Sequence, residues 1–251
     1  MIKQYLKILR KLQIMNKKTM KYAENSFCDY IFRQIGTLIS PVFIILRLHP
    51  TSINFINLFL GVIAFLVVYF NEEFLNYGIL IFYLSVLVDN TDGNVARYTK
   101  VASFHGRFMD GIFDILVIGF LRLSIFYFIL RNYNSDILII LSLLSILFIP
   151  ITHLYYDRYS AIVRWSNQLN KTSIQPYIRN KYGKKINFFL IDIQHFMLFF
   201  ILIFYQSKSS LENLILIFLI FSILHFIFNS LLHFKYSYKF LKNSQNLKRN
   251  N

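Results

Sequence analysis

The chain has 251 residues, of which 56% are hydrophobic, including 28 Phe and 17 Tyr, and its formal net charge is +15. This composition excludes an ordinary soluble domain and is typical of a polytopic membrane protein. The positive charge lies in short segments between apolar runs, which excludes nucleic acid as the expected partner and favours membrane lipid headgroups and an anionic substrate. The single cysteine, Cys28, excludes an intramolecular disulfide.

Residues 1–50 are predicted to form an amphipathic cytoplasmic and interfacial segment. Over residues 1–30, apolar side chains recur on one helical face and lysines and arginines on the other, which is typical of a helix lying in the membrane interface. The apolar stretch over 35–50 is short, contains Pro41 and ends at Pro50. We expect it to skim the membrane surface rather than to cross the membrane.

The remaining apolar runs predict an all-α integral membrane protein with six transmembrane helices. Each run is long enough to cross about 30 Å of hydrocarbon at roughly 1.5 Å per residue. The expected spans are 53–70, 75–97, 104–130, 137–157, 186–205 and 212–233. They make up one domain over residues 51–234, and a basic cytoplasmic tail over 235–251 follows it.

Lys and Arg in the connections predict the orientation. The N-terminal arm has nine, the 97–107 turn three, the 157–185 loop seven and the C-terminal tail five, whereas the alternate connections hold only Arg131 and Lys208. The positive-inside rule then places both termini and the 97–107 turn on the cytoplasmic side of the inner membrane, which requires an even number of spans. Arg122 lies within the third span and is expected to reach outward or to pair locally.

Four of the twelve acidic residues lie in the window 89–114, where the second expected span ends and the third begins. Asp89 and Asp92 are three residues apart, and Asp110 and Asp114 are four apart, so each pair shares one face of its helix. If the chain turns back at residues 98–103, the four carboxylates converge in one cavity between antiparallel helices. Carboxylates gathered in this way repel one another, and a stable site therefore needs a cation.

The composition of this cluster points to Mg²⁺ or Mn²⁺, since its ligands are all oxygen atoms. Mg²⁺ usually binds substrate phosphate as well. Gly93, Ala96 and Gly106 provide small residues where a ligand or another helix must come close. Arg97 and Arg107 could neutralise a diphosphate at the rim of the site.

These residues resemble the signature of the CDP-alcohol phosphatidyltransferases, D-x2-D-G-x2-A-R-x8-G-x3-D-x3-D, with every spacing kept. The matching residues are Asp89, Asp92, Gly93, Ala96, Arg97, Gly106, Asp110 and Asp114. The resemblance implies transfer of a substituted phosphate from a CDP-linked donor, commonly CDP-diacylglycerol, to an alcohol with release of CMP, in phospholipid biosynthesis. It also implies a homodimer.

The resemblance further implies a role for each residue of the hairpin. Asp89, Asp92 and Asp110 would be metal ligands, and Asp114 would be the catalytic base that also reaches a metal. Contacts with the CDP moiety would come from Gly93, Ala96, Arg97, Ser103 and Gly106. Family members tend to open the first span with Pro-Asn-x-apolar-Thr. This chain reads Pro50-Thr51-Ser52-Ile53-Asn54, with Asn and Thr interchanged, which makes Thr51 and Asn54 further candidates.

A second interpretation is a cation or proton-coupled transporter with a carboxylate-lined binding site. It is disfavoured because the cluster lies towards the cytoplasmic end and the sequence shows no inverted repeat. His153 with Asp157, and Asp192 with His195, could line an acceptor pocket, although hydrogen bonding between helices or contact with headgroups is the favoured interpretation. The residues after Asp110 match none of the family's common acceptor patterns, so the alcohol is left open.

Overall fold

The computed structural model describes residues 2–20, 26–170, 181–206 and 208–249, and almost all of them are helical. The elements in chain order are α1 (Ile2–Met20), α2 (Phe27–Ile45), α3 (Pro50–Phe70), the 3-10 helix η1 (Glu72–Phe74), α4 (Leu75–Thr99), α5 (Phe104–Asn132), α6 (Asp136–Asn170), α7 (Lys181–Ile203) and α8 (Lys208–Arg249). The described part of the chain contains no β-strand, which confirms the predicted all-α fold.

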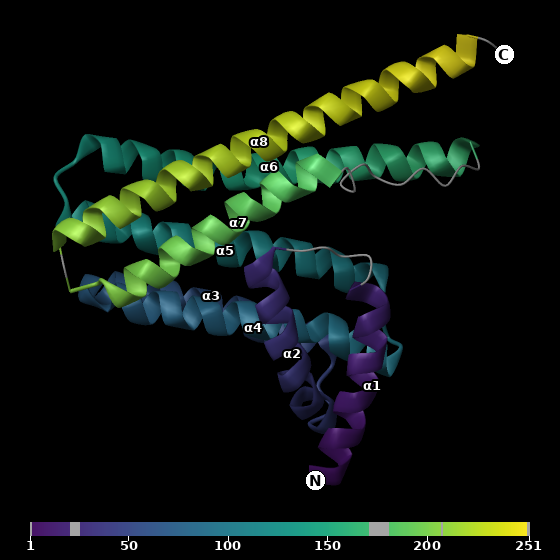
Figure 1. The fold of residues 1–251 in the computed structure, drawn as a ribbon, viewed down its shortest axis with the longest axis horizontal. Helices are drawn as coiled ribbons and strands as arrows, with labels where there is room; N and C mark the ends of the chain where they lie inside the picture. The colour runs from purple at the N-terminus through teal and green to yellow at the C-terminus, as the bar shows by residue number, and fades with distance from the viewer. Residues whose placement is uncertain (1, 21–25, 171–180, 207, 250–251) are drawn as a thin grey trace.

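Helices α3 to α8 run back and forth along the long axis of the molecule, each opposite in direction to the one before it (Figure 1). Helices α1 and α2 lie across this direction, beside the part of the bundle where α4 ends. The turn between α4 and α5 lies at the same end as α1. The hairpin that carries the acidic cluster therefore faces the two N-terminal helices.

Six helical segments among the described residues are long and apolar enough to cross a membrane, which confirms the predicted number. They are Phe27–Ile45, Pro50–Phe70, Glu72–Thr99, Phe108–Asn132, Asp136–Tyr155 and Ser210–Lys235. The set includes α2, which the sequence placed at the surface, and α7 contributes only the shorter apolar stretch Phe189–Ile203. Figure 1 shows α2 lying across α3–α8, whereas α7 runs along the long axis with its neighbours. Length and composition alone do not decide which of the two helices crosses the membrane, so the interfacial placement of the N-terminal segment stays a prediction.

The sequence suggested one helix over residues 1–30, but α1 ends at Met20 and a second helix, α2, begins at Phe27. Helix α2 begins at Phe27, where the Ser26 hydroxyl oxygen accepts a hydrogen bond from the Asp29 backbone N–H at 3.0 Å. The Asp192 carboxylate on α7 also accepts hydrogen bonds from the backbone N–H groups of Phe27 and Cys28, at 2.9 and 2.8 Å. These bonds satisfy donors that a helix start leaves unpaired.

Glycines allow α3 to pack closely against its neighbours. A Cβ atom added at Gly61 of α3 would lie 2.9 Å from the Val117 Cγ2 atom of α5, and one added at Gly78 of α4 would lie 2.5 Å from the Val68 Cγ2 atom of α3. Small residues at such contacts bring helix backbones close together. Helix α3 is thereby held against both helices of the acidic hairpin.

The position of Arg122 contradicts the expectation that it reaches outward or pairs locally. Its side chain is 4% exposed, and its guanidinium donates hydrogen bonds to the Gln194 side-chain oxygen of α7 and the Ser222 hydroxyl of α8, both at 2.8 Å. The guanidinium carbon also lies 4.2 Å from the centre of the Phe218 ring. Arg122 therefore ties three helices together, because polar partners and an aromatic ring replace the water it would find outside.

Replacing a partner of Arg122 should destabilise the protein more than replacing Arg122 itself. We expect Gln194→Leu to lower the free energy of unfolding by about 1.5–3 kcal/mol, since it leaves a buried charge short of an acceptor. Arg122→Met should cost less because it removes the charge, and the Ser222 hydroxyl can still donate to Gln194. Unfolding midpoints of the detergent-solubilised variants measure this order, and a larger loss in Arg122→Met would contradict it.

Candidate functional site

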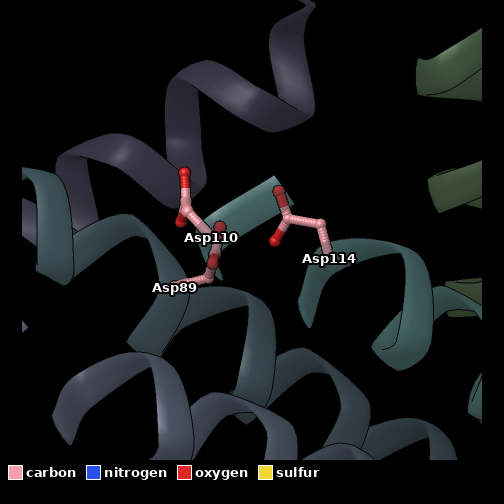
Figure 2. A group of neighbouring side chains, drawn as sticks. All are labelled: Asp89, Asp110 and Asp114. Carbon is pink, nitrogen blue, oxygen red and sulfur yellow. The ribbon is translucent and has the colours of Figure 1, made fainter. Parts of the chain in front are cut away.

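Three carboxylates converge where α4 meets α5. Asp89 of α4 and Asp110 and Asp114 of α5 each place a carboxylate oxygen so that the three atoms lie within 4.8 Å of one another. Figure 2 shows the three side chains approaching a common point from the two helices. The structure thus brings together three of the four expected metal ligands, whose role as ligands stays a prediction.

A short turn closes the hairpin on which these residues lie. Lys100 ends α4 in the left-handed conformation, with φ of 61°, and its N–H bonds to the Ala96 carbonyl. Ser103 then begins α5, where its hydroxyl oxygen accepts a hydrogen bond from the Gly106 N–H at 3.0 Å. With only residues 100–103 between the helices, the last turns of α4 must lie beside the first turns of α5.

Asp92 lies next to the three converging carboxylates but outside their group. Its Oδ1 atom accepts a hydrogen bond from the N–H of Gly93, and its carboxyl group contacts that of Asp110. The sequence predicted that four carboxylates converge in one cavity between the two helices. The structure has a group of three, and Asp92 touches it through Asp110.

Helix α3 supplies a polar residue to the site that the sequence reasoning missed. The Asn57 side-chain nitrogen donates a hydrogen bond to the Asp89 Oδ1 atom at 2.9 Å, and the Ser85 hydroxyl donates to the Asn57 side-chain oxygen. Asn57 is buried. A signal was present in the sequence, because Asn54 and Asn57 are three residues apart in an otherwise apolar span and therefore share a helix face.

The two candidates from the start of α3 have different surroundings. Asn54 is 2% exposed, its side chain contacts the Asp92 carboxylate, and its side-chain oxygen has no hydrogen-bond partner among the described residues. Thr51 instead lies beside His49, with its hydroxyl oxygen 3.1 Å from the His49 Nδ1 atom. Asn54 therefore belongs to the carboxylate site, and Thr51 forms part of the capped start of α3.

Arg97 is an exposed residue of α4 that lies one turn beyond Gly93. A Cβ atom added at Gly93 would lie 3.2 Å from an Arg97 guanidinium nitrogen, so the glycine makes room for this side chain. The guanidinium donates to the Asn94 side-chain oxygen at 2.8 Å. Asn94 also accepts from Asn16 of α1 at 3.1 Å and donates to Ser40 of α2 at 3.0 Å. The sequence reasoning missed this connection between the N-terminal helices and Arg97.

The remaining hairpin candidates lie near the turn between α4 and α5 in the chain. Ala96 is half-buried and supplies the carbonyl that ends α4. A Cβ atom added at Gly106 would lie 3.3 Å from the Ser103 hydroxyl oxygen, so the glycine leaves space beside the helix cap. The Arg107 side chain lies outside the described side chains.

The polar pair on α7 makes contacts between helices, the interpretation that the sequence favoured. Asp192 binds the first N–H groups of α2, as described above. The His195 ring lies among aromatic side chains, with ring centroids 5.3 Å from Phe32 and 5.9 Å from Tyr83, and its backbone carbonyl accepts a hydrogen bond from the Tyr83 hydroxyl. His153 is half-buried on α6, and the Asp157 side chain lies outside the described side chains.

The group of three carboxylates could hold a divalent cation. All its donor atoms are oxygen, which matches the preference of Mg²⁺ and Mn²⁺ over that of Zn²⁺. The three side chains come from two helices that a short turn holds together, so their relative positions are restricted. Negative charge gathered at one end of an apolar bundle attracts a cation and, through it, a phosphate group.

A family model described as CDP-alcohol phosphatidyltransferase matches residues 47–228, well over half of the chain. The matched range contains α3, α4 and α5 with all four hairpin aspartates. A search of the curated proteins finds no match.

Removing the Asp192 carboxylate should affect stability, because that carboxylate caps α2. We expect Asp192→Ala to lower the free energy of unfolding by about 1 kcal/mol. The control is Glu212→Ala, since Glu212 is exposed on α8 and its loss should change stability by less than about 0.5 kcal/mol. Thermal unfolding in detergent measures both, and equal stability of Asp192→Ala and the unchanged protein would contradict the capping role.

Proposed function

Since the chain belongs to the CDP-alcohol phosphatidyltransferase family, whose members are enzymes that transfer substituted phosphate groups, we propose that it moves a phosphatidyl group from CDP-diacylglycerol to an alcohol and releases CMP. The observation that carries the proposal is the group of three carboxylates from α4 and α5 within 4.8 Å of one another. The apolar helices support a lipid-linked donor that enters laterally from the membrane. The proposal includes a place in phospholipid biosynthesis.

Asp89, Asp92 and Asp110 are the proposed ligands of Mg²⁺ or Mn²⁺. When bound, the cation neutralises charge on the donor diphosphate and makes CMP a better leaving group. Two of these residues, Asp89 and Asp110, belong to the converging group, and Asp92 contacts Asp110. The hairpin turn keeps the ligands of α4 beside that of α5, so little reorganisation is needed for binding.

Asp114 is the proposed catalytic base and a further metal contact. It lies one turn beyond Asp110 along α5, deeper in the helix bundle, and its carboxylate still belongs to the converging group. In the proposed step the acceptor oxygen bonds to the phosphorus that carries the lipid, and the bond from that phosphorus to the oxygen of CMP breaks. The hydroxyl proton passes to the Asp114 carboxylate.

The CDP moiety is proposed to bind over Gly93, Ala96, Arg97, Ser103 and Gly106, with Arg107, Thr51 and Asn54 as further contacts. The guanidinium of Arg97 supplies positive charge at the rim beside Gly93, where a diphosphate would come close to the backbone. The Asn54 side-chain oxygen is buried without a partner among the described residues and could accept a hydrogen bond from the nucleotide. We further propose a homodimer with both termini and the site on the cytoplasmic side of the inner membrane.

CMP release from labelled CDP-diacylglycerol tests the proposed reaction. We expect the purified protein, given Mn²⁺ or Mg²⁺ and a panel of alcohols that includes polyols and polyol phosphates, to release CMP and form a labelled lipid with at least one acceptor. Removal of the divalent cation by a chelator should abolish release. Folded protein that releases no CMP with any acceptor, or that carries ions across liposomes without CDP-lipid, would contradict the proposal.

Two aspartate variants test the division of roles. Asp114→Asn should keep most cation binding and lose CMP release by about 10²-fold or more, because a positioned base contributes about 10²–10⁴-fold. Asp89→Asn should lose both cation binding and release. Mn²⁺ binding is measured from the electron paramagnetic resonance signal of the free ion, and CMP release from the same preparations. Full turnover in either variant would refute its assigned role.

A further inference from the structure

Asn57 and Ser85 form a buried chain of hydrogen bonds that ends on Asp89. The Asn57 side chain is 2% exposed and the Ser85 side chain is fully buried. The Asn57 nitrogen donates to the Asp89 Oδ1 atom at 2.9 Å, and the Ser85 hydroxyl donates to the Asn57 side-chain oxygen. Ser85 lies one turn before Asp89 on α4, whereas Asn57 reaches across from α3.

We propose that Asn57 is a positioning residue that fixes the orientation of the Asp89 carboxylate for cation binding, and that Ser85 in turn fixes the orientation of Asn57. This inference rests on the proposed function, because it takes Asp89 to be a ligand of the divalent cation. Neither residue belongs to the hairpin signature, and neither is proposed to touch the substrate or the cation.

The chemistry of Ser85, Asn57 and Asp89 decides which group donates and which accepts in each of these hydrogen bonds. An ionised carboxylate can only accept hydrogen bonds, so the nitrogen of the Asn57 amide must face Asp89. The amide oxygen then faces Ser85, whose hydroxyl can donate to it. Turning the amide over would set its oxygen against the Asp89 carboxylate. The Asp89 carboxylate therefore selects this arrangement of the Asn57 amide, and the hydrogen bond from the Ser85 hydroxyl to the amide oxygen holds the amide there.

The Asn57 bond also assigns the two oxygens of Asp89 to different tasks. Oδ1 receives the amide N–H at 2.9 Å, which leaves the second oxygen for a cation. Hydrogen bonds from residues behind a ligand orient it, and their loss usually costs about 10–100-fold in metal affinity or activity. We expect loss of the Asn57 hydrogen bond to weaken cation binding, because Asp89 lies beside Asp110 and Asp114. Without that bond, repulsion from their negative charges would move the Asp89 carboxylate out of position.

Cation binding by the full-length protein in detergent separates positioning from simple packing. We expect Asn57→Leu, which has a similar size and no donor, to raise the Mn²⁺ concentration for half-saturation by about 10–100-fold. Ser85→Ala should shift it in the same direction by less. Free Mn²⁺ is followed by electron paramagnetic resonance, and CMP release as a function of Mn²⁺ should show the same shift in half-saturation.

Two matched controls remove buried polar groups elsewhere. Gln194→Leu loses a buried amide in the Arg122 network and should leave Mn²⁺ binding unchanged at a temperature where the protein is folded. Ser145→Ala loses a fully buried hydroxyl that bonds to the Ser142 carbonyl of its own helix and should also leave binding unchanged. If Asn57→Leu does not fold, the comparison of Ser85→Ala with Ser145→Ala decides the question.

The outcomes distinguish this inference from the function on which it rests. If the unchanged protein binds neither Mn²⁺ nor Mg²⁺, the proposed metal site and this inference both fail. If the unchanged protein binds Mn²⁺ and folded Asn57→Leu binds it equally well, only the positioning role of Asn57 is overturned. Equal Mn²⁺ affinity in Ser85→Ala and Ser145→Ala would overturn the role of Ser85.

Discussion

Repulsion among carboxylates gathered in an apolar helix hairpin is the constraint on which the rest of this structure depends. Asp89, Asp110 and Asp114 lie within 4.8 Å of one another at the end of helices whose other buried residues are mostly apolar. Like charges this close repel strongly where water is scarce. The hairpin needs neighbouring helices that hold it closed and hydrogen-bond donors that face its carboxylates, and the proposed cation would offset the remaining repulsion. Each of these needs is a reason for a feature elsewhere in the chain.

Helices on three sides meet these needs in different ways. Helix α3 packs through glycine contacts against both helices of the hairpin and places the Asn57 amide on Asp89. Helices α1 and α2 lie beside the last turns of α4, and their Asn16 and Ser40 side chains hold Asn94, which in turn holds Arg97. The family match begins at residue 47, so this support comes from a segment that precedes the matched range. On the far side, the Arg122 network joins α5 to α7 and α8.

The features predicted well from the sequence were those that depend on neighbouring residues. Apolar runs of sufficient length predicted the helices, and spacings of three and four residues placed each aspartate pair on one helix face. The prediction about Arg122 was wrong, and the start of α2 at Phe27 was not foreseen. Both depend on partners far along the chain: Arg122 binds residues 72 and 100 positions away, and the start of α2 binds Asp192, 164 and 165 positions away. No local pattern carries that information.

The carboxylate hairpin shows the same division at the scale of one site. The sequence predicted the spacing of the aspartates and the short turn of the hairpin. Helical periodicity brings the aspartates of one helix to one side, and a turn brings the two helices together. Only the tertiary structure decided that Asp92 stands beside the group rather than in it, and that Asn57 faces Asp89. These depend on how side chains from separate helices divide the space between them. That division follows from packing across the whole bundle, in which α3 approaches the hairpin through glycines and can reach it with an amide.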